Sequence, residues 1–275
     1  MKRVLTGCVA LPLLLVIILF LPHLHYLAFC IVALLACLIG SYEIHAILIK
    51  DNHDKLALPP WCGSLLLVVT YIEYAYLPHY NLILYALIFL ISLVFTIETI
   101  KGGKDNFHLS RERMATSITQ IIYPNLFGVF FIRFAFLENA WLWLLTFLLF
   151  VFSSDTFAYL FGILFGKNNK NIVKVSPNKS VAGFIAGAFV PALEGALLTY
   201  FASIYGLTWY QGFLLGFCTA IAGILGDLIE SAFKRSANVK DSGTIIPGRG
   251  GIMDSIDSLV MAAPIFICLI HFILN

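Results

Sequence analysis

Hydrophobic positions along this chain form long runs that short polar stretches separate. About nine of these runs approach the roughly 20 residues that a helix needs to cross the apolar core of a bilayer. The predicted spans cover about 4–21, 25–48, 58–77, 81–100, 114–136, 140–165, 181–205, 209–233 and 254–274. The pattern therefore predicts an all-α, polytopic helical membrane protein with about nine transmembrane helices.

Composition agrees with this pattern. The chain is 60% apolar and only 12% charged, whereas a soluble domain carries about 25% charged residues. The net charge of +2 gives no reason to expect nucleic-acid binding. The six cysteines lie in or beside apolar runs without metal-ligand spacing. We expect them to be small buried hydrophobic residues, neither paired in disulfides nor bound to zinc.

Cationic residues predict the orientation of the spans. If the N-terminus is cytoplasmic, alternation of the nine spans places every Lys and Arg except Arg133 on the cytoplasmic side, as the positive-inside rule requires. The predicted outer connections are short, so we expect the chemistry in the membrane or at its cytoplasmic face. We divide the chain into an N-terminal transmembrane region of about four spans, 1–113, and a catalytic transmembrane region, 114–275.

Acidic residues inside apolar runs are candidates for function, because a charge in the membrane is costly and usually has a partner. Glu43, Glu73 and Glu98 are expected to face the bundle interior, and contact with a substrate is left open. Asp155 lies deep in the sixth span, either as a packing acid or as a functional one. Lys179 precedes the seventh span, where a helix N-terminus can hold phosphate or the lysine can simply anchor the span.

The eighth span carries a polar stripe. Asp227, Glu230, Ser231 and Lys234 have i, i+3, i+4 and i+7 spacing, which places them on one helical face. Such a face must look into the bundle or a wet cavity, because lipid would penalise it. Carboxylate oxygens suit Mg²⁺, which typically takes one or two carboxylates plus substrate phosphates. The cations that follow, Arg235 and Lys240, can hold phosphate oxygens.

A glycine-rich loop and two acids follow the stripe. The loop reads Pro247-Gly248-Arg249-Gly250-Gly251, and its glycines let the backbone approach a ligand and point N–H groups at it. Asp254 and Asp257 then begin the ninth span, one turn apart. Capping explains Asp254 alone, whereas metal ligation explains both acids. Together these groups suit Mg²⁺-dependent phosphoryl or nucleotidyl transfer with a lipid co-substrate.

The C-terminal part resembles the phosphatidate cytidylyltransferases (CDP-diacylglycerol synthases). Their signature, S-x-x-K-R-x4-K-D-x5-P-G-H-G-G-x2-D-R-x-D, matches residues 231–257 at every position except Arg249, where the family has His, and Ser255, where it has Arg. The family elements around Asp155 and Ser176 are also present, with Ala182 in place of Glu. The resemblance covers roughly 114–275 and is highly specific.

The resemblance implies that CTP and phosphatidate are converted to CDP-diacylglycerol and pyrophosphate, with Mg²⁺ as cofactor. The expected partners are CTP and phosphatidic acid in the bilayer, with a second cation and a homodimer left open and no nucleic acid. The expected location is the bacterial inner membrane, with the site on the cytoplasmic face. The expected catalytic residues are Asp227, Lys234, Asp254 and Asp257; the metal ligands Asp227, Glu230, Asp254 and Asp257; and the CTP contacts Asp155, Lys179, Ser231, Arg235, Lys240, Asp241, Arg249, Gly250 and Gly251.

Three alternative functions agree less well with the sequence. Another membrane CTP-dependent enzyme, such as a polyprenol kinase, does not account for the long signature, and the D-G-x-x-A-R motif of CDP-alcohol phosphotransferases is absent. A cation-coupled lipid transporter predicts paired repeats and broken helices, which the sequence does not show.

We also expect the cationic contact of the family's Arg to have moved from Ser255 to Arg249. Unchanged CTP affinity and turnover in Arg249→Ala contradicts that expectation.

Overall fold

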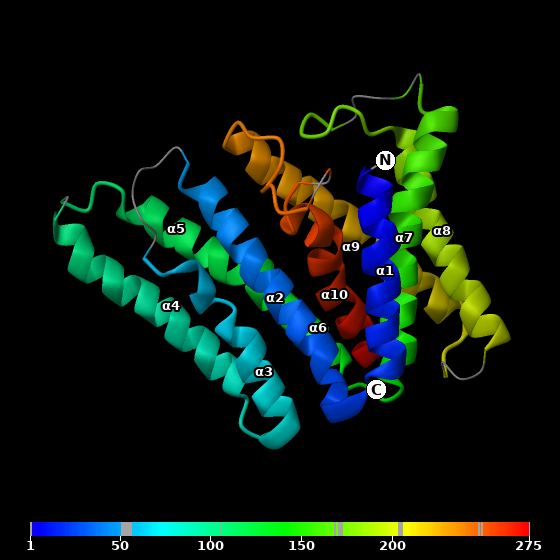
Figure 1. Ribbon diagram of the computed structural model, residues 1–275, viewed down its shortest axis with the longest axis horizontal. Coiled ribbons are helices and arrows are strands. Elements are labelled where there is room, and N and C mark those ends of the chain that lie inside the picture. The colour runs from blue at the N-terminus through cyan, green and yellow to red at the C-terminus, as the bar shows by residue number, and fades with distance from the viewer. Residues whose placement is uncertain are drawn as a thin grey trace. The chain divides into compact units, whose positions relative to one another are not determined.

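The computed structural model describes residues 2–50, 57–104, 106–167, 169, 173–202, 206–246, 248 and 250–274, with the side chains of 2–10 and 104 left aside. Helices are the regular elements of these residues, together with one isolated bridge between Ile246 and Gly250 (Figure 1). The all-α prediction is therefore confirmed for the part described. Arg249, a predicted phosphate contact, lies outside the described residues.

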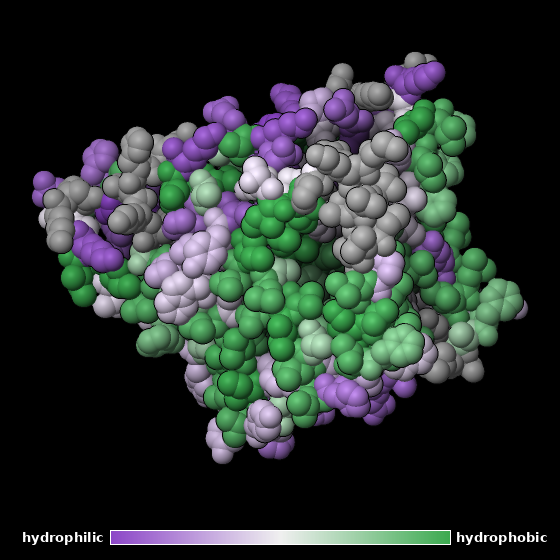
Figure 2. Space-filling model, viewed as in Figure 1, coloured by the Kyte–Doolittle hydropathy of each residue, from purple (hydrophilic) through white to green (hydrophobic). Residues whose placement is uncertain are grey.

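Seven helices of the described chain are long and apolar enough to cross a membrane. They are His23–Leu48, Leu82–Lys101, Ser110–Phe134, Ala140–Phe165, Val181–Phe201, Trp209–Ser236 and Met253–Leu274. Large apolar side chains such as Leu84, Phe89, Leu193 and Leu197 are exposed on these helices, and apolar residues cover much of the visible surface (Figure 2). An exposed apolar surface of this extent marks a membrane protein. The chain is thus an integral membrane protein.

The predicted total of nine spans is not confirmed, and it stays a prediction. The first expected span contains a shorter apolar helix, Leu11–Phe20, in the part whose side chains are described. The third expected span, 58–77, contains a 3₁₀ turn, η1 (Pro60–Cys62), and then α3 (Leu65–Tyr76). Twelve residues of helix extend only about 18 Å, short of the roughly 30 Å apolar core. Pro59 and Pro60 begin this stretch, and the chain forms the 3₁₀ turn there before the α-helix starts at Leu65.

The described chain forms two compact units, 1–138 with 236–255 and 139–235 with 256–275. These limits follow packing, whereas the expected division at residue 113 follows composition and motifs and stays a prediction. The first unit holds α1 (Lys2–Phe20), α2 (His23–Leu48), η1, α3, α4 (Leu82–Lys101), η2 (Gly102–Lys104), α5 (Ser110–Gln120), η3 (Ile121–Leu126), α6 (Phe127–Phe134), the loop after residue 236 and the first residues of α10 (Met253–Leu274). The second holds α7 (Ala140–Phe165), α8 (Val181–Phe201), nearly all of α9 (Trp209–Ser236) and the rest of α10.

A buried polar centre organises the first unit. The fifth expected span changes from α-helix to a π-helical turn at η3, where Pro124 has no N–H to give. Asn125, fully buried, accepts hydrogen bonds from Ser41 on α2 (3.0 Å) and Ser64 before α3 (2.9 Å). It donates to the Gln120 carbonyl (3.0 Å). One side chain therefore ties three segments of this unit together.

Close helix contacts organise the second unit. Gly216 on α9 lies against the backbone of α8, so that a Cβ there would be 2.1 Å from the Pro191 carbonyl oxygen. Gly195 and Gly212 meet in the same way. Small residues let membrane helices approach this closely. Elsewhere in this unit, Phe266 of α10 packs edge-on against Phe147 of α7, with ring centroids 5.4 Å apart.

The five cysteines with described side chains are free thiols whose burial varies, and the side chain of Cys8 lies outside the described part. Cys30, Cys37 and Cys62 are buried, whereas Cys218 is half-buried and Cys268 is exposed. The expectation of burial is therefore wrong for Cys268. Apolar surroundings in a membrane protein include the lipid-facing surface, so an apolar sequence context does not by itself predict a buried side chain.

Candidate functional site

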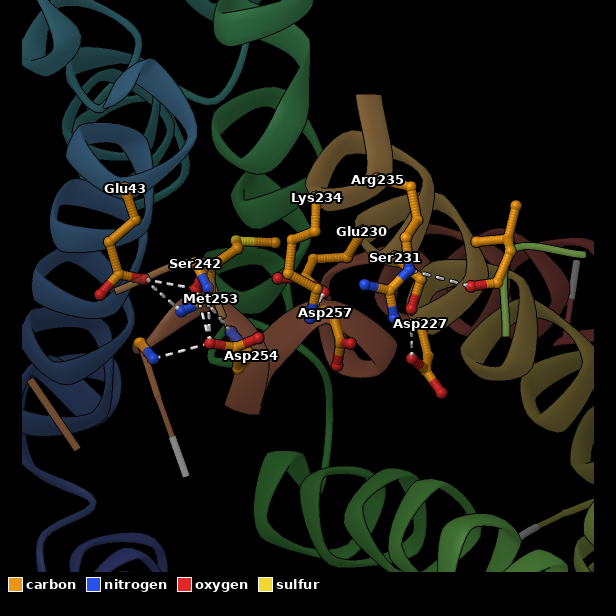
Figure 3. A network of polar contacts seen from close by, with 12 residues as sticks. Glu43, Asp227, Glu230, Ser231, Lys234, Arg235, Ser242, Met253, Asp254 and Asp257 are labelled. Carbon is orange, nitrogen blue, oxygen red and sulfur yellow. Dashed lines mark hydrogen bonds and ion pairs between the residues drawn. The ribbon is translucent and has the colours of Figure 1, made fainter. Parts of the chain in front are cut away.

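Polar side chains form two clusters, one in each unit. In the second unit, the polar stripe of α9 begins with Asp227, which is half-buried, and continues one turn later with Glu230, which is fully buried. Lys234 pairs with Glu230, and the Ser231 hydroxyl donates to Asp227 Oδ1 at 3.4 Å. We call Lys179, Asp227, Glu230, Lys234 and Asp257 the charged cluster, of which Figure 3 shows Asp227, Glu230, Lys234 and Asp257.

Asp257 adds a buried carboxylate to the charged cluster. It lies one turn inside α10 and is 8% exposed. It interacts electrostatically with Asp227 and Glu230, and more weakly with Asp155 on α7. Several carboxylates gathered in apolar surroundings are costly unless cations lie among them. The arrangement therefore favours the binding of a cation or of ammonium groups.

Lys179 supplies such an ammonium group. Its Nζ lies 2.5 Å from Asp227 Oδ2 and 5.6 Å from the centre of the Phe184 ring. The following residue, Ser180, caps α8: its hydroxyl accepts the Gly183 N–H at 3.1 Å. The predicted helix start is confirmed, and it holds Lys179 beside the α9 stripe. The positive end of the α8 dipole next to a lysine suits a phosphate group.

Other predicted site residues are more exposed. Asp155, Arg235, Lys240 and Asp241 all have exposed side chains. Arg235 Nε donates to the Val175 carbonyl at 3.5 Å, which links α9 to the segment before α8 within the second unit. A phosphate contact from an exposed cation needs no rearrangement of the core.

The second cluster lies in the first unit and surrounds the start of α10. Asp254 Oδ2 accepts three hydrogen bonds: from the Ser242 N–H (2.9 Å), the Ser242 hydroxyl (2.9 Å) and the Gly251 N–H (2.7 Å). Asp254 therefore closes the loop of residues 242–252 onto the helix. We call Glu43, Ser242, Gly251 and Asp254 the loop cluster (Figure 3).

Glu43 approaches the same loop from α2. Its Oε1 accepts the Ile252 N–H at 3.0 Å, and its Oε2 accepts the Met253 N–H at 2.8 Å and the Ser242 hydroxyl at 3.2 Å. Glu43 is 6% exposed. Bundle-facing placement of the three N-terminal acids is confirmed. Glu73 accepts the Ile83 N–H at 2.6 Å, and Glu98 pairs with Arg113 at 2.5 Å.

The predicted loop glycines have steric reasons to be glycine. Gly250 has a φ angle of +110°, a backbone conformation that residues with a side chain rarely adopt. A Cβ on Gly251 would be 2.3 Å from Glu43 Oε2 and from the Ser242 hydroxyl. The Ser255 hydroxyl, at the position of the signature's second arginine, is buried and has no hydrogen-bond partner among the described groups. The loop is thus closely fitted around carboxylates.

Sequence reasoning missed two members of the loop cluster. Glu43 was noticed only as an acid in an apolar helix, and Ser242 was not singled out. Glu43 lies 209 residues before Ile252, and no local spacing reports a contact over that distance. Ser242 had a weak signal, since it is a small polar residue directly after the signature's Lys240-Asp241.

The carboxylates of the site suit the expected Mg²⁺ by the type of their donor atoms. Among the described residues, no group of three or more His, Cys, Asp and Glu side chains is arranged to hold a metal ion. Mg²⁺ commonly takes only one or two carboxylates and completes its shell with water and substrate phosphate. The charged cluster offers carboxylate oxygens of the type that Mg²⁺ prefers. The donors therefore fit the ion by type, and the individual ligand assignments stay predictions.

Comparison with known proteins decides the family. A sequence model of the cytidylyltransferase family matches residues 1–273. The chain belongs to this family. Carboxylates and lysines are the groups with which proteins commonly hold cations and phosphate oxygens, so the charged cluster is compatible with membership of this family.

Relatives of this cytidylyltransferase carry a more specific name. Proteins named phosphatidate cytidylyltransferase from Staphylococcus aureus (strain COL) and Staphylococcus haemolyticus are 44% identical over 119 residues and 42% identical over 115 residues. A third, from Staphylococcus epidermidis, is 41% identical over 117 residues. Each match covers 42% of this chain and 44% of the relative. The matched stretch thus spans less than half the length of these relatives.

Proposed function

We propose that the protein is a phosphatidate cytidylyltransferase, which converts CTP and phosphatidate to CDP-diacylglycerol and pyrophosphate. The observation that carries this proposal is the charged cluster on helices of a membrane-embedded cytidylyltransferase. A set of buried and half-buried carboxylates and lysines suits a polyanionic substrate, and the apolar helices that carry it suit a lipid one. The names of the staphylococcal relatives support the same substrates.

The reaction forms one bond and breaks one. An oxygen of the phosphatidate phosphate bonds to the α-phosphorus of CTP, and the bond from that phosphorus to the oxygen bridging to the β-phosphate breaks. Pyrophosphate leaves with the electron pair. A phosphate monoester has a second pKa of about 6, so its oxygen is largely ionised at neutral pH and no residue has to remove a proton. The protein must instead bring two polyanions together.

The charged cluster suits this task. Lys179 and Lys234 lie among carboxylates, so phosphate oxygens arriving there meet ammonium groups already held in place. Arg235 and Lys240, which are exposed, are proposed to hold outer phosphate oxygens. Asp227, Glu230 and Asp257 are proposed to hold Mg²⁺, which neutralises phosphate charge when bound. From the match to the signature, we propose Asp254 as a further ligand of Mg²⁺, and Gly250 and Gly251 as contacts of CTP.

We further propose that the site faces the cytoplasm of a bacterial inner membrane. CTP is a cytoplasmic nucleotide, and the predicted topology places the cationic residues on that side. A homodimer and a second cation remain predictions from the resemblance. No described contact bears on either of them.

The test is direct synthesis with purified protein. Labelled CTP, phosphatidate and Mg²⁺ are supplied in mixed micelles, and CDP-diacylglycerol and pyrophosphate are measured together. We expect equimolar products, at least a hundredfold loss in Asp227→Asn, and wild-type rates in Glu112→Gln. Glu112 is an exposed acid on α5, so this control makes the same change of charge elsewhere. Absence of product from the wild-type protein contradicts the proposal, as does full activity in Asp227→Asn.

A further inference from the structure

Glu43 does for α10 what a capping residue usually does. The first N–H groups of a helix have no acceptor within the helix. Here the N–H groups of Ile252 and Met253 are both accepted by the Glu43 carboxylate, one on each oxygen, at 3.0 and 2.8 Å. A charged acceptor strengthens both bonds. The start of α10 is therefore held by a side chain of α2, within the first unit.

The Ser242 hydroxyl connects Glu43 to Asp254. It lies 3.2 Å from Glu43 Oε2 and 2.9 Å from Asp254 Oδ2, and it accepts the Asp254 N–H at 3.3 Å. A serine hydroxyl has one proton, so the two carboxylates share a single donor. Glu43 therefore acts on Asp254 in two ways: through this shared hydroxyl, and through the loop whose Ser242 and Gly251 N–H groups donate to Asp254 Oδ2.

Two loop glycines lie close against the Glu43 carboxylate. A Cβ on Gly243 would be 2.5 Å from Glu43 Oε1, and a Cβ on Gly251 would be 2.3 Å from Glu43 Oε2. Two loop glycines thus enclose the carboxylate on both oxygens. The loop and the acid fit each other closely, which is the condition for one to orient the other.

We propose that Glu43 is a positioning residue for Asp254: it fixes the loop of residues 242–252 and so presents the Asp254 carboxylate, with the Gly250–Gly251 backbone, to the cation and phosphates of CTP. This inference rests on the proposed function. The comparison with Glu98 sharpens it, because Glu98 pairs with an arginine between α4 and α5. The described donors to Glu43 instead lie in the segment that the family signature covers.

The test compares Glu43→Gln with Glu73→Gln. Glu73 is a matched control, since it is also buried in the first unit and accepts a backbone N–H at the start of a helix, α4. In Glu43→Gln, the amide nitrogen cannot accept, so one of the two N–H groups loses its acceptor. We expect Kd for CTP, measured by calorimetry with Mg²⁺ present, to rise roughly tenfold or more. Glu73→Gln should bind CTP as the wild type does.

A second pair of readouts separates positioning from loss of fold. The Mg²⁺ concentration for half-maximal activity should rise in Glu43→Gln, and saturating Mg²⁺ should recover most of kcat, which unfolded protein cannot do. Independently of activity, amide exchange in a peptide spanning 250–254 should accelerate in Glu43→Gln and stay unchanged in Glu73→Gln.

The outcomes distinguish the two proposals. Unchanged exchange at 250–254 together with wild-type CTP affinity in Glu43→Gln overturns the positioning role while the proposed function stands. Equal losses in both Gln variants also overturn it, because they point to general destabilisation. Absence of CTP binding and of product in the wild type overturns the function and, with it, the role of Glu43.

Discussion

Asp227 meets an ammonium group in this structure, with Lys179 Nζ 2.5 Å from its Oδ2. The proposed cation and the lysine are therefore alternative neighbours of the same carboxylate. If a cation bound Asp227 as proposed, Lys179 would stay nearby at the start of α8, where its ammonium group could pair with a phosphate group. Lys179 is in this view more than an anchor for the helix.

The first prediction concerns this lysine. In Lys179→Ala we expect KM for CTP to rise roughly tenfold or more, because a charged hydrogen bond to phosphate is worth about 1.5–3 kcal/mol. Steady-state kinetics at fixed phosphatidate measure it. Lys174→Ala removes an exposed lysine from the same segment and should leave KM unchanged. Equal KM values for all three proteins rule out a phosphate contact at Lys179.

A second prediction uses the pair formed by Glu230 and Lys234. Glu230 is fully buried, so removing the charge of Lys234 in Lys234→Met should destabilise the protein by about 3 kcal/mol. Glu230→Gln should cost a similar amount, and the double variant less than the sum, since no charge is then left without this partner. Thermal denaturation in detergent completes the cycle. Additive losses would show that the pair does not couple.

At the scale of the helices, the close approach of α8 and α9 affects the charged cluster. α8 and α9 approach closely enough at Gly216 that a Cβ there would overlap the Pro191 carbonyl. Because α9 carries the polar stripe and α8 follows Lys179, this contact sets the separation between the lysine and Asp227. The spacing of the charged cluster thus depends on residues that carry no charge.

The third prediction tests this spacing. Gly216→Ala should lower thermal stability by roughly 1–3 kcal/mol, the usual cost of overpacking, and reduce activity with it. Gly223→Ala on the same helix is the control, since its added Cβ would have only ordinary contacts at 3.7 Å. Melting temperatures and product formation measure both variants. Similar values for the two would contradict a tight helix contact at Gly216.

A fourth prediction concerns the polar centre of the first unit. Asn125→Ala removes an acceptor of two buried serine hydroxyls and should cost about 2 kcal/mol, because a buried donor without an acceptor is expensive. The loss falls mainly on Ser64, since the Ser41 hydroxyl keeps the Cys37 carbonyl at 2.8 Å. Thermal denaturation in detergent measures this loss. Thr99→Ala on α4 changes an exposed hydroxyl that bonds only within its helix and should be close to neutral. A neutral Asn125→Ala would mean that the centre does not tie the segments together.

Much of this element-level structure could be predicted from the sequence. The seventh expected span, 181–205, is observed as Val181–Phe201, and the stripe from Asp227 to Lys234 lies on α9 as its spacing required. Periodicity predicts such features because they are local. It did not predict the interruption at η3, and it gave no sign that Glu43 contacts a loop some 200 residues later. Such contacts depend on how helices pack, which spacing within one helix does not encode.

At the scale of the whole molecule, the positive-inside rule predicts the orientation in the membrane. The fifth prediction places His79 outside and Lys174 in the cytoplasm, both with exposed side chains. In a background without native cysteines, an impermeant maleimide should label His79→Cys in intact cells and Lys174→Cys only in inverted vesicles. This expectation follows from the positive-inside rule. The reverse labelling pattern would place the lysine-rich loops, and the proposed site, on the wrong side for CTP.

The contact of Glu43 with the α10 start also has a consequence for biogenesis. During synthesis, Glu43 emerges 209 residues before the Ile252 amide that it accepts. For most of translation this carboxylate lacks its final donors, and the loop that supplies them orders only after nearly the whole chain has been made. A nascent or truncated chain that ends between residues 237 and 251 therefore carries α2 and the charged stripe of α9 but lacks the Ile252 and Met253 amides that Glu43 accepts. Completion of the polypeptide is in this way a condition for the loop to take its final form.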